Sequence, residues 1–314
     1  TNPRFQILGQ GTLPSATPVK MEQFSAGSMD SQWIELEGIV RAVANESGHA
    51  ALDIAAGTNR LRAFIPGFGN QAAPAQLVDA KVTIRGVAGT FTNPNDQSRG
   101  VQFYVPNLDQ ITLLEAGVAD PFSLPARPMA GVQRGDPQEI FSHRVRVGGT
   151  VSFLQRSNVL FIQEESGGLS VRTFGSAALQ PGDVVDVAGF PTFTGYGPVL
   201  EDAVVRRIRS GPAPQPAAVT ASQVLEGRFA GKLLSLDGRV MELSSRRGEA
   251  VLILKTGKVV FEVVLNTGNA NLTREFLPAS SSVRVTGVCS LPTEGTGAQG
   301  QIYCSRPSSR AARF

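Results

Sequence analysis

Side chains that could do chemistry are few and widely spread along these 314 residues. The two histidines, His49 and His143, lie in a glycine-flanked turn and at the start of a predicted strand, and neither has further ligands at metal-binding spacing. Paired carboxylates such as Glu35 and Glu37 could serve glycoside hydrolysis, but the intervening Leu36 places both on the solvent face of a strand. We therefore predict no catalytic constellation, no metal site and no cofactor, and expect a non-enzymatic region.

The two cysteines, Cys289 and Cys304, are the remaining reactive side chains. Cys289 ends one predicted strand and Cys304 lies in the next, so a hairpin symmetrical about Thr296 and Gly297 would place them opposite each other at disulfide distance. A disulfide would suit an oxidising compartment. A register shift of one residue would instead leave two unpaired, buried thiols, and the sequence leaves both alternatives open.

Arginine and aromatic residues alternate in the middle of the chain and form the candidate binding site. Side chains of these types on the outside of a small barrel can stack bases or sugars. The same residues could instead pack against a neighbouring domain. The basic run Arg206, Arg207 and Arg209 is interpreted as a solvated strand end. The candidate ligand-binding residues are Arg146, Phe161, Gln163, Arg172, Phe174 and Tyr196.

These candidates lie in residues 142–208, whose hydrophobic pattern predicts five short strands. Apolar and polar residues alternate with a period of two, which is typical of strands buried on one face. Ser-Gly-Gly at 166–168 and Pro-Gly at 181–182 favour tight turns between the strands. Five antiparallel strands within about seventy residues, with glycine inside the first, predict a small closed barrel of the oligonucleotide/oligosaccharide-binding (OB) type.

Three copies of this pattern follow one another along the chain. The first strand of each copy alternates and then reaches a glycine and a valine, at residues 33–40, 143–151 and 233–240. The fourth strand of each copy also carries a glycine, at Gly86, Gly189 and Gly287. These glycines are about one hundred residues apart, which is too long for a solenoid repeat and typical of tandem small domains.

Proline-rich connectors precede the three copies, and connectors of this composition are semi-rigid. They comprise residues 13–19, 120–128 and 211–216. Between each connector and the first strand we expect one or two helical turns that cap a barrel end. The sequence thus predicts an all-β chain of three tandem, five-stranded OB-like barrels. The expected divisions are repeats at 13–119, 120–210 and 211–314, preceded at 1–12 by the last strand of a truncated repeat.

Several segments also carry a family resemblance. DSQWIELEGIVRAV, HRVRVGGTV, LFIQEESGGLSVRT, LQPGDVVDVAGFP and PVLEDAVVRRI occur in the same order as in the tandem extracytoplasmic region of acidobacterial-type sensor histidine kinases. The chain resembles this region from about Phe5 to Cys304. The resemblance implies the input portion of a two-component receptor at the periplasmic face of the inner membrane. It also implies a membrane span and an output domain downstream of this chain, with a homodimer allowed in the parent receptor.

The charge balance gives little support for nucleic-acid binding, because the formal net charge is only +3 with an isoelectric point of about 9.1. The sequence contains no stretch of about eighteen apolar residues, so it predicts no membrane span within these residues. We therefore expect a sensory region that binds a small molecule, a glycan or a protein partner, with nucleic acid disfavoured. The alternative is a single-stranded nucleic-acid-binding protein, whose oligonucleotide affinity would fall steeply with salt.

Overall fold

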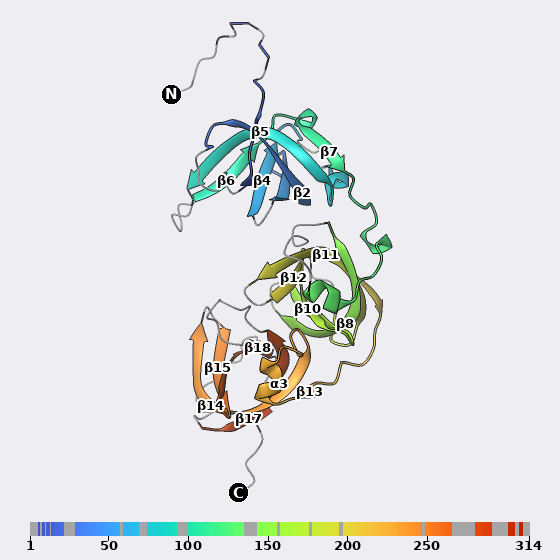
Figure 1. The fold of residues 1–314 in the computed structure, drawn as a ribbon, viewed down its shortest axis with the longest axis vertical. Helices are drawn as coiled ribbons and strands as arrows, with labels where there is room; N and C mark the ends of the chain where they lie inside the picture. Colours follow the sequence, from blue (N-terminus) through green and yellow to red (C-terminus); the bar gives the residue numbers. More distant parts are fainter. Residues whose placement is uncertain are drawn as a thin grey trace. The chain divides into compact units, whose positions relative to one another are not determined.

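The structure is a computed structural model, and its described residues form two compact units, Thr1–Gly117 and Val118–Phe314. The first unit contains one barrel and the second contains two, drawn in chain order from blue to red in Figure 1. No helix among the described residues is long and apolar enough to cross a membrane. The described residues are 6, 8–9, 11–12, 14–21, 29–56, 59–68, 74–92, 99–134, 143–155, 158–175, 178–194, 197–246, 249–265, 280–290, 301–304 and 308–309.

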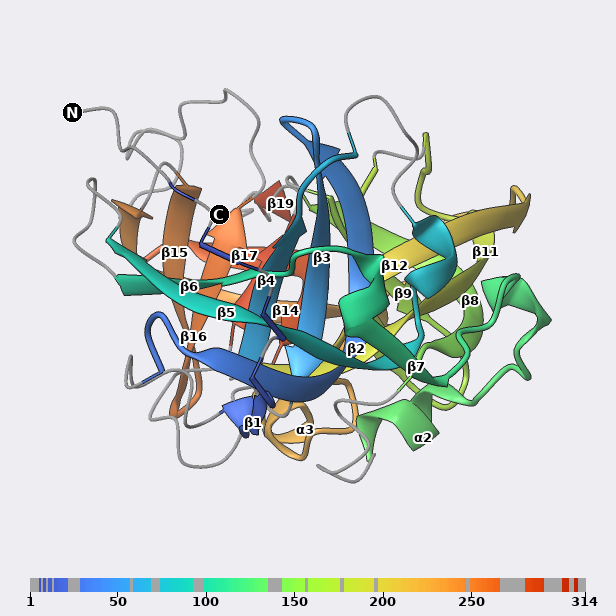
Figure 2. The ribbon, with the colours of Figure 1, turned by 90° about the horizontal axis from the view of Figure 1, so that it is seen from above.

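Barrel 1 is a sheet of five strands that closes on itself. Its strands are β2 (Trp33–Glu46), β3 (His49–Ala56), β4 (Asn59–Ile65), β5 (Lys81–Thr92) and β6 (Arg99–Tyr104). They pair in the order β2-β3-β4-β6-β5, and β5 returns to β2 (Figure 2). Short strands extend this sheet at β1 (Thr17–Pro18) and β7 (Ile111–Glu115), with 3-10 turns at η1 (Ala75–Leu77) and η2 (Leu108–Gln110).

Barrel 2 follows the connector and has the same strand order. Its elements are η3 (Pro121–Ser123), α2 (Met129–Gln133), β8 (Val145–Gln155), β9 (Val159–Gln163), β10 (Gly168–Thr173), β11 (Val184–Thr194) and β12 (Gly197–Arg209). The five strands form a closed barrel, ordered β10-β12-β11-β8-β9.

Barrel 3 repeats the order once more. Its elements are β13 (Ala217–Ala218), α3 (Ala221–Leu225), β14 (Leu233–Arg246), β15 (Glu249–Thr256), β16 (Val259–Leu265), β17 (Ser282–Ser290), β18 (Gln301–Cys304) and β19 (Ser308–Ser309). The pairing of β14 with β17 closes its sheet. The prediction of an all-β chain of tandem OB-like barrels is therefore confirmed.

One detail of the predicted barrel is wrong, because its strands are not all antiparallel. The third and fifth strands of every barrel pair in parallel, as β4 with β6, β10 with β12 and β16 with β18. The fourth and fifth strands are antiparallel to each other, and the fifth lies beside the third after two reversals of direction. Parallel pairing of the third and fifth strands is the result.

The first strand of each barrel has a β-bulge directly after Val40, Val151 or Val240. The turn that precedes the fourth strand is hydrogen-bonded to the first strand at this bulge. A valine of the first strand, Val40, Val151 or Val240, exchanges two backbone hydrogen bonds with this turn. The turn residue that donates its N–H has a positive φ, at Asp79 (70°), Gly182 (103°) and Ser280 (75°). The repeat visible in the sequence is therefore also a repeat of backbone conformation.

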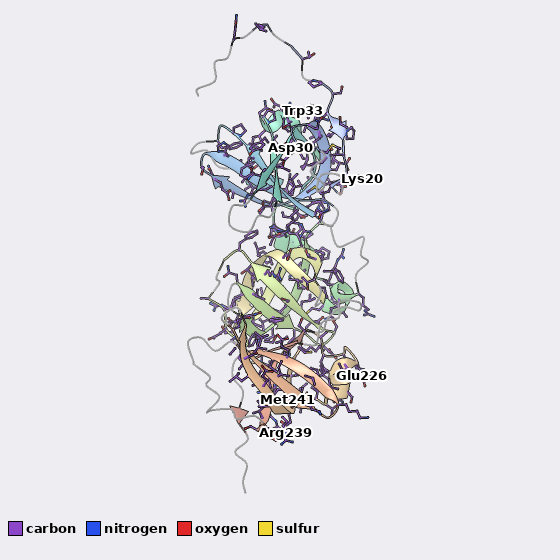
Figure 3. All side chains as sticks on the ribbon, turned by 90° about the vertical axis from the view of Figure 1, so that its left-hand side faces the viewer. Lys20, Asp30, Trp33, Glu226, Arg239 and Met241 are labelled. Carbon is purple, nitrogen blue, oxygen red and sulfur yellow. The ribbon has the colours of Figure 1, made fainter. Side chains whose placement is uncertain are left out.

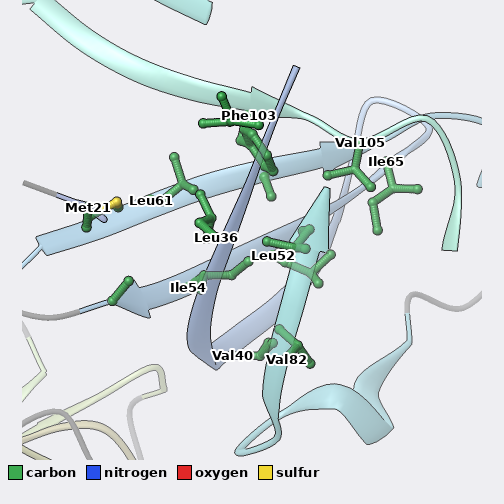
Figure 4. Packing of buried hydrophobic residues seen from close by; sticks show 14 of the residues in the cluster. Met21, Leu36, Val40, Leu52, Ile54, Leu61, Ile65, Val82, Phe103 and Val105 are labelled. Carbon is green, nitrogen blue, oxygen red and sulfur yellow. The ribbon is translucent and has the colours of Figure 1, made fainter. Parts of the chain in front are cut away.

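Each barrel has an apolar interior made by the inward-facing residues of its strands. In barrel 1, Leu36, Leu52, Ile54 and Phe103 are buried together (Figure 4). The strand glycine Gly38 lies against β3, where an added Cβ would be 2.7 Å from the carbonyl oxygen of Ala55. A larger residue cannot occupy this position without moving the adjacent strand.

The expected helical caps are present in barrels 2 and 3. In α2, Met129 and Val132 are buried in the core of barrel 2. In α3, Ala221 and Val224 are buried in the core of barrel 3. Thr220 and Gln223 form a capping box that satisfies backbone N–H groups at the start of α3.

The strand expected within residues 1–12 is not observed. Residues 6, 8–9 and 11–12 have irregular structure, and the other residues of this stretch lie outside the described part of the chain. Leu8 is 91% exposed, so it packs against no core that would stabilise such a strand.

Candidate functional site

Two predicted ligand-binding residues, Phe161 and Gln163, lie where barrels 2 and 3 meet. Phe161 is only 4% exposed and packs with Phe153 and with Val288 of barrel 3. The Oε1 atom of Gln163 accepts a hydrogen bond from the backbone N–H of Leu233 at 2.8 Å. The alternative recognised from the sequence, packing against a neighbouring domain, therefore holds for these two residues.

Backbone groups complete this contact, which we call the junction and define by Phe153, Phe161, Gln163 and Gly168 facing Gly231, Leu233 and Val288. Gln133 Nε2 donates to the carbonyl oxygens of Gly168 at 2.7 Å and Ala230 at 3.3 Å. An added Cβ on Gly168 would lie 2.2 Å from the carbonyl oxygen of Gly231. The junction therefore covers the outer face of β9 and fixes barrel 3 against barrel 2.

Arg146 binds the connector. Its Nη2 atom lies 2.9 Å from Asp186 Oδ2, and its Nη1 atom donates to the carbonyl oxygen of Leu124 at 3.1 Å. The backbone carbonyl of Arg146 also accepts from Arg127 N–H at 2.8 Å. The charge and backbone of Arg146 thus hold residues 120–128 on barrel 2, and its ligand-binding role stays a prediction.

The basic run at the end of β12 also has partners. Arg206 Nη2 lies 2.9 Å from the same carboxylate oxygen of Asp186, and its guanidinium carbon lies 4.3 Å from the ring centre of Phe122. Arg207 lies 3.7 Å from Asp183. A hydrogen bond from Ser210 holds the pKa of Asp183 below its ordinary value. This strand end is exposed, as expected from the sequence, and Arg206 and Arg207 also form ion pairs there.

The remaining predicted residues do not form one site with these. Arg172 is 53% exposed and its Nη1 atom donates to Glu201 Oε1 at 2.7 Å. Phe174 is 61% exposed. Tyr196 lies outside the described residues. The structure therefore divides the predicted set between the junction, the connector and separate surface positions.

The register of the last hairpin also differs from the symmetrical one. Cys289 pairs with Ile302, whereas Cys304 pairs with Gly287, because the hairpin centre is displaced from Thr296 and Gly297. Cys289 is a free cysteine buried in the core of barrel 3. Burial raises the pKa of its thiol to about 12. Of the two alternatives that the sequence left open, Cys289 has the second, a buried free thiol.

A different surface, on barrel 1, combines arginine and aromatic side chains in the way that the sequence predicts for barrel 2. Along β4 the residues Leu61, Ala63 and Ile65 are buried, so Arg62 and Phe64 point outwards. We name this surface the Phe64–Tyr104 face, and it comprises Asp53, Arg62, Phe64, Gly89, Gln102 and Tyr104. Figure 3 shows the side chains on barrel 1.

Two aromatic rings form the centre of the face. Phe64 pairs directly with Tyr104 across β4 and β6, and their ring centres are 6.3 Å apart with a tilt of 31°. Tyr104 is 52% exposed, and its hydroxyl donates to Gln102 Oε1 at 2.8 Å. The ring lies over Gly89, where an added Cβ would be 2.8 Å from Cε2 of Tyr104. The glycine thus provides the space that the tyrosine ring occupies.

Charge on this face is balanced by local ion pairs. Arg62 contacts the carboxylate of Glu46, and its Nε atom lies 3.7 Å from Asp53 Oδ1. Its guanidinium carbon is also 6.0 Å from the ring centre of Phe64. The face therefore offers stacking surface and hydrogen-bonding groups, with its arginine shared between two acids.

Within the described ranges, no group of three or more His, Cys, Asp and Glu side chains is placed to hold a metal ion. His49 is exposed, and its Nδ1 atom lies 3.0 Å from the carbonyl oxygen of Ser47. Glu35, considered above with Glu37 as an acid pair, accepts a hydrogen bond from Arg85 Nε at 2.5 Å.

Comparison with known proteins gives weak likenesses to solved structures. No family model matches the chain, and no curated protein matches it. An aspartyl-tRNA synthetase from Entamoeba histolytica is 13% identical with a TM-score of 0.28, over 38% of this chain and 30% of that chain. This chain thus spans less than a third of that synthetase.

Two further solved structures cover about half of this chain. A murine DNA-binding protein bound to double-stranded DNA is 11% identical over 54% of this chain and 98% of its own, with a TM-score of 0.31. The Ifi202 HINa domain in complex with 20-bp double-stranded DNA is 10% identical over 52% and 96%, with a TM-score of 0.29. At these identities the likeness concerns the fold alone.

Proposed function

We propose that this chain is a non-catalytic, extracytoplasmic ligand-binding region of a sensory receptor, and that barrel 1 receives the ligand on the Phe64–Tyr104 face. The observation that carries this proposal is the contrast between two equivalent faces. Register places Asp53 of β3 at the position of Phe161 of β9. In barrel 2 the position of Phe161 is covered by barrel 3, whereas in barrel 1 Asp53 stands on a surface with a half-buried Phe64 and a 52% exposed Tyr104.

The face has the properties of a preorganised binding surface. Tyr104 is held by Gln102 and lies over Gly89, so its ring loses little freedom when a ligand stacks on it. Aromatic rings with a polar edge combine apolar contact with hydrogen bonding. In OB barrels, oligonucleotides and oligosaccharides bind on the face of the second and third strands.

The sensory part of the proposal rests on the family resemblance and on the fixed barrel pair. The junction makes barrels 2 and 3 one body, and Arg146 and Asp186 hold the connector on that body. A ligand that binds one arrangement of barrel 1 and the connector more tightly than another would shift the population towards it. The shift is limited by the difference between the two affinities.

The test is titration calorimetry of the 314-residue chain with three probes: cellohexaose, chitohexaose and a dT12 oligonucleotide. At least one probe should bind, and Tyr104→Ala should weaken its binding about tenfold or more, because a stacked ring contributes about 1–3 kcal/mol. Phe174→Ala removes an equally exposed aromatic side chain from barrel 2 and should leave the affinity unchanged. Absence of binding by all three probes, or equal binding by Tyr104→Ala, would contradict the proposal.

Single-stranded nucleic acid is the alternative ligand class, and the guanidinium of Arg62 near Phe64 is the observation in its favour. In that case dT12 would bind in the calorimeter and its affinity would fall steeply between 50 and 300 mM salt, roughly as expected for counterion release.

A further inference from the structure

We propose that the ligand of the Phe64–Tyr104 face is an uncharged carbohydrate chain; this inference rests on the proposed function and specifies its ligand class. Two features of the face select this class. One is the pairing of its charges, and the other is the combination of stacked rings with groups that can both donate and accept hydrogen bonds.

The charges of Arg60 and Arg62 on β4 are balanced by two acids on the adjoining strands, Asp53 on β3 and Glu46 at the end of β2. Arg60 and Arg62 point outwards from β4, since they alternate with the buried Leu61 and Ala63. The carboxylates of Asp53 and Glu46 stand beside Arg62. Two positive and two negative groups give this surface no excess of positive charge, which a phosphate backbone would require.

Two further cations of barrel 1, Arg85 and Lys81, are paired as well. Arg85 lies 2.5 Å from Glu35, and Lys81 lies 3.4 Å from Glu115. A polyanion that bound one of these cations would break its ion pair. The protein carboxylate would then lie unpaired and close to the negatively charged ligand. An uncharged ligand avoids this repulsion.

The polar groups beside the rings match the hydroxyl groups of a sugar. A pyranose ring has one face of C–H groups that can lie on an aromatic ring, and it has hydroxyls around its rim. The Tyr104 hydroxyl and the Gln102 amide can each donate and accept, while Arg62 donates and Asp53 accepts. Asp53, Arg62 and Gln102 form one row across three adjacent strands, next to the row that holds Phe64 and Tyr104.

Gly89 offers a variant that moves the ring without removing it. Its φ is not positive, so alanine fits the strand backbone, and the new Cβ would displace the Tyr104 ring that lies 2.8 Å away. Gly89→Ala should therefore weaken binding while keeping every aromatic residue. Gly175→Ala, at a glycine with no heavy atom within 4 Å of its Cβ position, is the matched control.

The experiment is calorimetry on the 314-residue chain at 50 and 300 mM NaCl with cellohexaose, chitohexaose, maltohexaose, a hexagalacturonate and dT12. We expect at least one neutral hexasaccharide to bind, with less than a twofold change between the two salt concentrations. Tyr104→Ala should weaken this binding about tenfold, and Tyr104→Phe, which keeps the ring, should weaken it less. Gly89→Ala should weaken it and Gly175→Ala should not.

The outcomes separate the two proposals. Binding of dT12 or hexagalacturonate at this face, lost with salt and with Tyr104→Ala, would overturn the carbohydrate inference and leave the proposed function in place. Binding of a neutral hexasaccharide that Tyr104→Ala and Gly89→Ala both leave unchanged would place the sugar elsewhere and overturn the inference. Failure of all five probes to bind would overturn both.

Discussion

Barrels 1 and 2 share one topology but use the same outer face differently. In barrel 2, Phe161 on the second strand is buried against barrel 3. In barrel 1 the equivalent residue is Asp53, which lies beside Arg62 on an exposed surface. On the third strand the aromatic residue is in barrel 1 instead, because Phe64 occupies the position that Arg172 has in barrel 2. An aromatic residue on the second strand thus joins two barrels, and one on the third strand lies at an open face.

The size of the apolar contact explains this difference. A buried phenylalanine contributes about 1.5–3 kcal/mol through the surface it removes from water. Phe153, Phe161 and Val288 contribute together in the junction, and Gln163 satisfies the N–H of Leu233 at its edge. An aspartate at the position of Phe161 would not stabilise such a contact, because burying its charge costs more than the packing gains.

The largest expected difference is in thiol reactivity between a buried cysteine, Cys289, and a cysteine introduced at the exposed position of Tyr104. Burial raises the pKa of Cys289 from its ordinary 9.0 to about 12, so the thiolate fraction at pH 8 falls roughly a thousandfold. Iodoacetamide should label Tyr104→Cys rapidly and Cys289 very slowly in the native chain, as read by peptide mass spectrometry. In denaturant without reductant Cys289 should label fully; failure to do so would show that it is disulfide-bonded.

The next largest effect is expected from Phe161→Ala. Removal of this ring leaves a cavity between barrels 2 and 3 and should lower the free energy of unfolding by about 3 kcal/mol in urea denaturation. Phe174→Ala, 61% exposed, should change it by less than about 0.5 kcal/mol. Equal effects of the two variants would mean that Phe161 is not held in the junction.

Gly168→Ala probes the backbone contact of the junction. The added Cβ would lie 2.2 Å from Gly231 O, so the barrels must separate locally at a cost of about 1–3 kcal/mol. The Leu233 amide, bonded to Gln163, should then exchange its hydrogen faster. Gly175→Ala should leave this exchange rate unchanged, and unchanged exchange in Gly168→Ala would show that the two barrels do not meet at this glycine.

The smallest effect concerns Glu164, which accepts hydrogen bonds from Ser166 and from Met129 N–H at the start of α2. The Ser166 hydrogen bond lowers the pKa of Glu164 below its ordinary 4.5. Its stabilising contribution is therefore present at neutral pH and is lost as the pH falls below about 4.5. Ser166→Ala should lower the melting temperature at pH 7 more than at pH 3.

A change in Tm of equal size at both values would contradict this role for Glu164. Glu165→Gln is the control, because it neutralises the adjacent, exposed carboxylate and leaves the bonds of Glu164 to α2 in place.

The sequence was sufficient to predict the barrels because their pattern is local. Alternation places Val145 and Val147 inwards, and the repeated glycines mark places where strands approach too closely for a side chain. Alternation also predicted correctly that Arg146 and Gln163 point outwards. It could not show that Gln163 meets the backbone of Leu233, because that contact joins residues 70 positions apart on different barrels.

The Phe64–Tyr104 face could have been found from the sequence. Arg62 and Phe64 alternate with buried residues, and so do Gln102 and Tyr104 around Phe103. What was missing is the parallel pairing of the third and fifth strands, which brings Phe64 beside Tyr104. A prediction of antiparallel strands throughout leaves these two segments unconnected.

The junction also has a consequence for synthesis on the ribosome. Barrel 2 can close once β12 has emerged, but Val288 of barrel 3, which covers Phe153 and Phe161, is translated later. At ordinary elongation rates the delay is on the order of several seconds. During that interval a folded barrel 2 exposes two phenylalanines to solvent, and transiently exposed apolar surface of this kind favours aggregation.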